Sequence, residues 1–175
     1  MYQLYNAYEA ISRFMDQGGD VLWLIAALTF AMWMLIFERL WYFRTGLKED
    51  IANVITSWEE RSERKSWNAQ QIRRAMIAKI TEGINQHMAL ISTMVALCPL
   101  LGLLGTVTGM IEVFNIMAVT GGGDAKSMAG GVSRATIPTM AGMVAALSGV
   151  FANTYVTRIA TRESTLVEDR LTTDH

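Results

Sequence analysis

The chain lacks the residue patterns by which most enzymes and metal proteins are recognised. It contains no Ser-His-Asp set, no glycine-rich phosphate loop and no cluster of metal-ligating side chains. Its two histidines, His87 and His175, are isolated from each other and are expected at the surface. We therefore predict neither catalysis nor a bound cofactor.

Cysteine, proline and net charge are also scarce. The single Cys98 cannot form an internal disulfide, and its apolar neighbours favour a packing role. A net charge of −1 gives no electrostatic case for binding nucleic acid. The two prolines, Pro99 and Pro138, each deprive the carbonyl four residues earlier of its helical partner. Inside a membrane this is tolerated where protein or water covers the freed oxygen, so both prolines weakly indicate an interior cavity.

Charged residues are missing from three long stretches, and these predict the fold class. The stretches are Val21–Phe37, Met88–Ile111 and Ala135–Thr157. A hydrocarbon core of about 30 Å needs roughly 20 residues of helix, which the last two provide. The first continues through Glu38 and Arg39 into an aromatic end typical of the membrane interface. We predict an all-α membrane protein with three transmembrane helices per chain.

Two other readings of the apolar stretches are disfavoured. A soluble helical bundle needs polar outer faces, whereas Leu22–Phe37 is apolar on every side. A cleaved signal peptide needs a basic start, whereas the first stretch follows Glu9, Asp16 and Asp20.

Lysine and arginine predict the orientation of the helices. The segment 38–87 carries nine of them and the segment after the third helix three, against Arg13 and Lys126 on the opposite side. Because basic residues accumulate on the cytoplasmic side, we place the N-terminus in the periplasm and the C-terminus in the cytoplasm.

These patterns predict seven parts of the chain. They are a periplasmic amphipathic segment at 1–20, transmembrane helices at 21–43, 88–119 and 128–157, a cytoplasmic helical segment at 44–87, a flexible periplasmic loop at 120–127 and a cytoplasmic tail at 158–175. The first segment places Leu4, Tyr8, Ile11 and Met15 on one stripe and is expected to lie along the outer membrane surface. The mixed charges around 59–65 indicate solvated helices that partly extend the membrane helices.

Small residues mark the second and third helices as packing partners. Lipid supplies no hydrophobic drive for helix association, so close backbone approach through small side chains takes its place. The predicted packing positions are Gly102, Gly105, Gly109, Gly142, Ala146 and Gly149.

Four polar side chains in these helices have two possible roles. Thr106, Thr139, Ser148 and Asn153 either bond to a backbone carbonyl one turn back, or line a water-filled passage.

Glu112 and Arg134 are the charged residues whose placement in the membrane is costly. Such groups usually face protein or water and have a partner. Each lies several residues from the outer loop on antiparallel helices, so both reach a similar depth. We predict an intramembrane charge pair, within one chain or between neighbours. The alternative is that Arg134 reaches the lipid headgroups independently.

Two motifs resemble those of the ExbB/TolQ/MotA proton-channel family. The run 100–111, LLGLLGTVTGMI, followed by Phe114, is similar to the second-helix motif of the family. The run 128–135, MAGGVSRA, followed by Thr139 and by 142–146, GMVAA, is similar to the start of its third helix. The resemblance covers about 99–153. The short length of the chain and the residues GTVTGMI at 105–111 are closer to ExbB than to MotA. Both features resemble the compact ExbB of an accessory TonB system.

The resemblance implies a homopentamer in the bacterial inner membrane, whose second and third helices line a pore. It also implies ExbD-like single-span subunits in that pore, one of which carries the proton on an aspartate, and a TonB-like protein that receives the motion. Thr106 and Thr139 match the polar pore positions of the family. The implied function is to energise outer-membrane uptake of iron chelates and vitamins.

The chain departs from the family pattern at Arg134, where many ExbB and TolQ members have a glutamate; Glu112 is the compensating carboxylate that we expect. This departure argues against a proton-carrying role for the chain itself. Competing readings are a TolQ-like envelope motor, a membrane scaffold that conducts no protons, and a small solute carrier. The last would normally show inverted repeats, which three helices do not offer.

Overall fold

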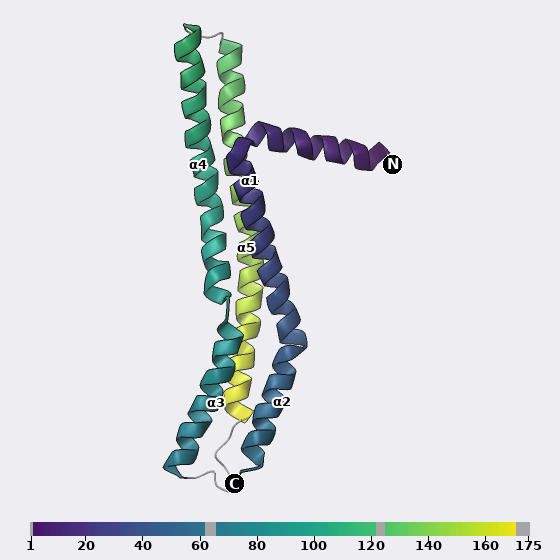
Figure 1. Ribbon diagram of the computed structural model, residues 1–175, viewed down its shortest axis with the longest axis vertical. Coiled ribbons are helices and arrows are strands. Elements are labelled where there is room, and N and C mark those ends of the chain that lie inside the picture. The colour runs from purple at the N-terminus through teal and green to yellow at the C-terminus, as the bar shows by residue number, and fades with distance from the viewer. Residues whose placement is uncertain (1, 62–65, 122–124, 171–175) are drawn as a thin grey trace. The chain divides into compact units, whose positions relative to one another are not determined.

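The computed structural model describes residues 2–61, 66–121 and 125–170. Five helices make up this part of the chain: α1 (Tyr2–Arg44), α2 (Gly46–Glu59), α3 (Trp67–Asn85), α4 (Met88–Thr120) and α5 (Ala125–Arg170) (Figure 1). The middle of the predicted outer loop (122–124), part of the charged run (62–65) and the end of the predicted tail (171–175) lie outside the described residues.

Three helical stretches are long and apolar enough to cross a membrane. They are Tyr8–Arg44, Trp67–Val119 and Met128–Arg170. The prediction of an all-α chain with three such helices is therefore confirmed, while the side of the membrane on which each end lies stays a prediction. Pro99 and Pro138 both lie inside continuous helices. The predicted tail is, as far as Arg170, a continuation of α5.

A sharp bend divides α1 near its start. Gly19 has φ 66° and ψ −164°, a conformation that side-chain-bearing residues rarely adopt. The segment before Gly19 therefore runs in a different direction from the apolar part that follows (Figure 1). Tyr5, Tyr8 and Ile11 on this first segment are all exposed.

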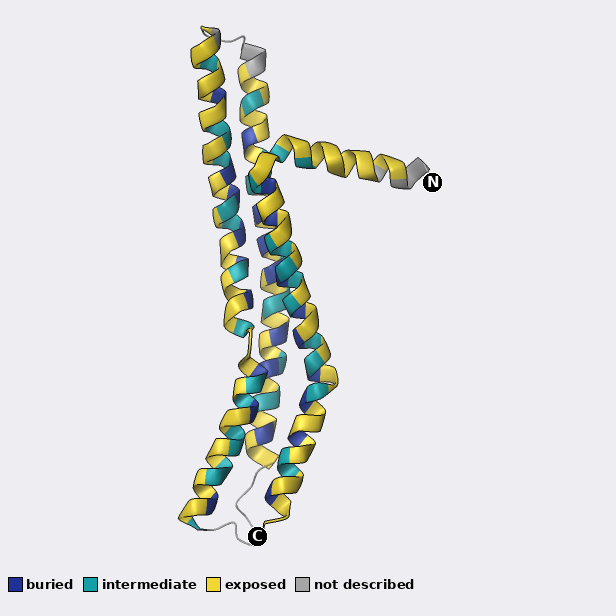
Figure 2. Ribbon diagram, viewed as in Figure 1, coloured by how far each residue is buried: buried dark blue, intermediate teal, exposed yellow. Residues whose placement is uncertain are grey.

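The helices form two compact units, each described here by itself. The first unit comprises Met1–Trp33 and Thr93–Val150. Its core is a cluster of small and medium side chains from three helices: Ile25 of α1, Cys98 of α4, and Ala145 and Ala146 of α5. Many residues of its helices are exposed (Figure 2). They include large apolar side chains such as Phe30, which is 73% exposed. Such a surface suits contact with lipid or with neighbouring chains rather than with water.

The second unit comprises Met34–Ser92 and Phe151–His175. Apolar side chains from α2, α3 and α5 are buried in it: Leu47, Ile51, Trp58, Ile80, Ile84, Val156, Ala160 and Val167. The Arg73 guanidinium donates to the Glu168 carbonyl at 3.0 Å, which joins α3 to the end of α5. The segment at 44–87 is therefore not uniformly solvated, because its two helices share an apolar core with α5.

Candidate functional site

Helices α4 and α5 approach each other through glycines at backbone distance. A methyl group placed at Gly102 would lie 2.9 Å from the Cα of Thr139, and one at Gly142 would lie 2.5 Å from the Cys98 carbonyl oxygen. Real Cβ atoms do not approach other heavy atoms so closely, so only glycine fits at these positions. At Gly109 the same methyl group would lie 2.8 Å from the Cβ of Ala135. We call Gly102, Gly105, Gly109 and Gly142 the glycine seam.

The remaining position of the seam, Gly105, and the other predicted packing positions have different neighbours. Gly105 faces the ring of Pro138 on α5 and the Val21 side chain of α1. Gly149 faces Met32 of α1, whose Sδ would lie 2.6 Å from an added methyl group. Ala146 belongs to the buried cluster around Cys98. A further position, Gly131, faces Val113 of α4 and was missed by the sequence reasoning, although it lies in a Gly-Gly pair.

Thr139 forms a hydrogen bond between two helices at the glycine seam. Its hydroxyl donates to the Gly102 carbonyl oxygen at 2.8 Å, across 37 residues of sequence. Neither of the two predicted roles describes this bond, since the acceptor lies on α4 rather than one turn back on α5. The hydroxyl oxygen keeps lone pairs with which it can accept a further hydrogen bond.

Thr106 bonds within its own helix. Its hydroxyl donates to the Leu103 carbonyl at 2.6 Å, as the backbone-bonded interpretation expects. Gly102 and Thr106 are four residues apart on α4, which corresponds to about 6 Å along the helix axis. Thr139 therefore bonds to α4 one turn before Thr106, and no hydrogen bond links the two hydroxyls in the described part of the chain.

The remaining two polar side chains differ from each other. Ser148 donates to the Ala145 carbonyl at 2.8 Å, again within one helix turn. The Oδ1 atom of Asn153 is buried and has no hydrogen-bond partner among the described residues.

Glu112 and Arg134 line one cavity of about 450 Å³. The bend of α1 contributes Asp16 and Asp20 to the same cavity, so three carboxylates share it with one guanidinium. Within 2–61, 66–121 and 125–170, no ion pair joins Glu112 to Arg134 in the single chain. Both side chains are exposed, and a pair between neighbouring chains stays a prediction. Asp16 and Asp20 were not selected from the sequence. The Gly18-Gly19 pair between them, at which α1 bends, was the signal that could have indicated their position.

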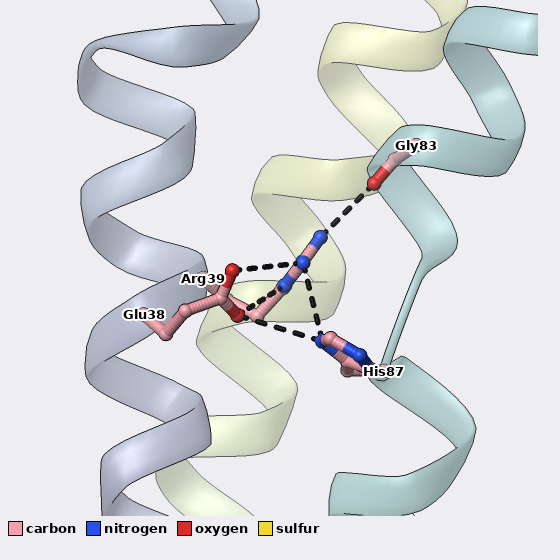
Figure 3. Close-up of polar contacts among 4 residues, drawn as sticks. All are labelled: Glu38, Arg39, Gly83 and His87. Atoms are coloured by element: carbon pink, nitrogen blue, oxygen red, sulfur yellow. Dashed lines mark hydrogen bonds and ion pairs between the residues drawn. The ribbon is translucent and has the colours of Figure 1, made fainter.

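A second polar cluster surrounds Arg39, near the end of α1. Arg39 is 2% exposed, whereas the sequence suggested an interfacial anchor. Figure 3 shows its guanidinium between α1 and the junction of α3 with α4. It donates to both Glu38 carboxylate oxygens, at 2.8 and 2.9 Å, and to the Gly83 carbonyl at 3.0 Å. The Tyr42 ring lies 5.1 Å from the guanidinium carbon, within cation–π range.

His87 completes this cluster. Its Nδ1 lies 3.3 Å from the Arg39 guanidinium and 3.6 Å from a Glu38 oxygen. An arginine can only donate, so the contact with Arg39 requires the imidazole tautomer that carries its proton on Nε2. The sequence reasoning treated His87 as an isolated surface residue, because its partners lie 48 and 49 positions away.

Comparison with protein families gives a match over residues 39–169 to the MotA/TolQ/ExbB proton channel family. The chain belongs to this family. Members are membrane-embedded proton channels rather than enzymes, and the three apolar helices agree with a multi-pass membrane protein. The match includes the glycine seam, Thr106, Thr139 and the charged residues Glu112 and Arg134. The bend at Gly19, with Asp16 and Asp20, lies before it.

Two relatives carry ExbB-like names. The Synechocystis sp. protein named ExbB-like 1 is 51% identical over 61 residues, which cover 33% of this chain and 24% of that protein. ExbB-like 3 of the same organism is 38% identical over 69 residues, which cover 38% of this chain and 33% of that protein. The chain thus spans about a quarter to a third of these relatives. Together with the family match, they support an ExbB family member.

Proposed function

We propose that this ExbB family member is the pore-forming subunit of a proton-driven motor in the bacterial inner membrane. In the proposed assembly five copies form a ring around ExbD-like single-span subunits, and a TonB-like protein receives the motion. The motor energises outer-membrane uptake of iron chelates or vitamins. The observation that carries the proposal is the Thr139 hydroxyl, held at the glycine seam one turn from Thr106 in a chain of the proton channel family.

The two threonines suit a proton path without carrying the proton themselves. A hydroxyl both donates and accepts hydrogen bonds, so it can hold water or a carboxyl group in either protonation state. A partner carboxylic acid stays neutral in a dry pore, because desolvation penalises its charged form, and can ionise beside hydroxyls and water. Each proton that crosses the membrane releases about 2.3 kcal/mol per 100 mV. A ring of identical chains would offer repeated, equivalent stations for this exchange.

Native mass spectrometry of the detergent-extracted protein tests the proposed assembly. The chain is expressed with its genomic neighbours in one sample and alone in the other. We expect a five-chain ring that retains a small single-span partner in the first sample. A monomer or dimer without such a partner would contradict the motor and favour the scaffold.

Exchanging the two intramembrane charges tests the predicted pair. An unpaired charge in a spanning helix costs about 2.5–3.5 kcal/mol, so Glu112→Arg or Arg134→Glu alone should lower the yield of assembled ring by roughly 10-fold or more. The double variant should recover most of that loss, because opposite charges then face each other again. Ring yield is measured on native gels of membranes extracted under identical conditions. A double variant no better than the worse single variant would show that the two residues act independently.

A further inference from the structure

The junction between α3 and α4 has an unusual backbone. Gln86 ends α3 with an extended ψ of 135°, and His87 has φ 63°, in the left-handed region that non-glycine residues rarely adopt. The sequence does not require a break here: residues 84–98 contain neither glycine nor proline, and Gly83 lies within the last turn of α3 rather than at the break. Contacts with residues outside this segment therefore keep α3 and α4 as separate helices. A strained residue such as His87 persists only where its surroundings enforce the conformation.

The Arg39 cluster supplies that enforcement. In a continuous helix the Gly83 carbonyl would accept a hydrogen bond from the N–H of His87, four residues later. Here the Arg39 guanidinium donates to this carbonyl at 3.0 Å. The Arg39 guanidinium thus takes the place of the His87 N–H as donor to the Gly83 carbonyl. This carbonyl is therefore hydrogen-bonded although α3 and α4 are separate helices.

The cluster is also closed around the guanidinium. Burying an arginine is unfavourable unless its donors are paired, and Glu38, Gly83 and His87 together provide acceptors. Glu38 keeps 46% of its side chain exposed, so one partner of the ion pair is in contact with solvent. The contact with His87 ties the side chain of the strained residue to the same guanidinium that caps α3.

We propose that Glu38, Arg39 and His87 form a latch that keeps α3 and α4 as two helices, and that its opening joins them into one continuous helix through Gln86–His87. The Gly83 carbonyl has a donor in each state: Arg39 when the latch is closed, and the His87 N–H when it is open. This carbonyl is therefore satisfied in both arrangements of the junction. The proposal rests on this geometry and not on the proposed motor.

Backbone hydrogen exchange in the assembled, membrane-reconstituted protein tests the latch. Near the start of α4, amides are expected to exchange fast when the helices are separate, and slowly when one helix runs through the junction. Arg39→Met removes the guanidinium, so we expect exchange of the peptide spanning 86–90 to slow by about 10-fold or more. Arg44→Met is the matched control, since Arg44 is an exposed arginine at the end of the same helix and should leave exchange unchanged.

A second pair of variants isolates the backbone preference of position 87. His87→Gly and His87→Ala both remove the imidazole, but glycine tolerates the left-handed conformation and alanine favours the helix. We expect the alanine variant to exchange at least about 10-fold more slowly than the glycine variant at this peptide. Faster exchange in Arg39→Met, or equal exchange in the two position-87 variants, would overturn the latch. Should Arg39→Met fail to fold, the position-87 pair decides alone.

Discussion

Replacing Thr139 by alanine is expected to stop energised transport while leaving the folded chain in the membrane. The change removes one hydrogen bond between helices, which is worth about 0.6 kcal/mol on average in membrane proteins. The Gly102 carbonyl keeps its own helical donor four residues later, so no buried group is orphaned. Misplacing a reacting group by about 1 Å can cost about 100-fold in rate, so losing the hydroxyl that holds water or the partner carboxyl group should lower proton flux by about 100-fold. Flux is measured in liposomes that contain the chain and its single-span partner.

Two variants control this experiment. Thr139→Ser keeps the hydroxyl and should retain most of the flux. Thr136→Ala removes an exposed hydroxyl that bonds to the Ser133 carbonyl on the same helix, and should have no effect. Normal flux in Thr139→Ala would remove this residue from the proton path, whatever the fate of Thr106.

Adding a single methyl group at Gly142 is expected to destabilise the chain. In an ordinary helix Gly→Ala stabilises by roughly 1 kcal/mol, because glycine loses more entropy on folding. At Gly142 the added Cβ would lie 2.5 Å from the Cys98 carbonyl oxygen, a backbone atom that cannot turn aside. Overpacking of this kind costs about 1–3 kcal/mol, which corresponds to a lower Tm by roughly 2–12 °C for a chain of this size.

Gly130 offers the matched control for this change. It lies on the same helix α5, and a methyl group added there would have no neighbour within 4 Å. Gly130→Ala should therefore leave the Tm unchanged or raise it slightly. The measurement is tryptophan fluorescence during heating of the purified protein, which contains five tryptophans. Equal Tm values for the two variants would mean that α4 and α5 separate at Gly142 without cost.

The helices themselves could be predicted because charge is expensive in a membrane. The second uncharged stretch begins at Met88, where α4 also begins. The bend in α1 falls at Gly19, one residue before the predicted end of the first segment. The bend follows from a local property of the chain, the conformational freedom of glycine. The absence of charge predicts the apolar length of α4 but not the break that precedes it.

Contacts between distant residues could not be predicted in the same way. Thr139 finds its acceptor 37 positions earlier, and Arg39 finds acceptors at Gly83 and His87, more than 40 positions later. A sequence shows that such side chains need partners, because unpaired polar groups in an apolar interior are costly. It does not show which of several carbonyls or carboxylates will be within reach. Arg134 illustrates this: the sequence predicts Glu112 as its partner, but Asp16 and Asp20 line the same cavity as both residues.

The glycine seam restricts how α4 and α5 can move against each other. Sliding α5 by one turn would bring Pro138 or Ala146 to the place of Gly142, and each carries a Cβ that the Cys98 carbonyl leaves no room for. The glycine seam thus interlocks α4 and α5, which are expected to move together as one rigid unit. A movement of α4 against α5 is opposed by these contacts. In the proposed assembly, turning or tilting would therefore occur between neighbouring chains, or between the ring of chains and the subunits that it encloses. In the proposed motor this makes the chain a bearing surface, with the moving part inside it.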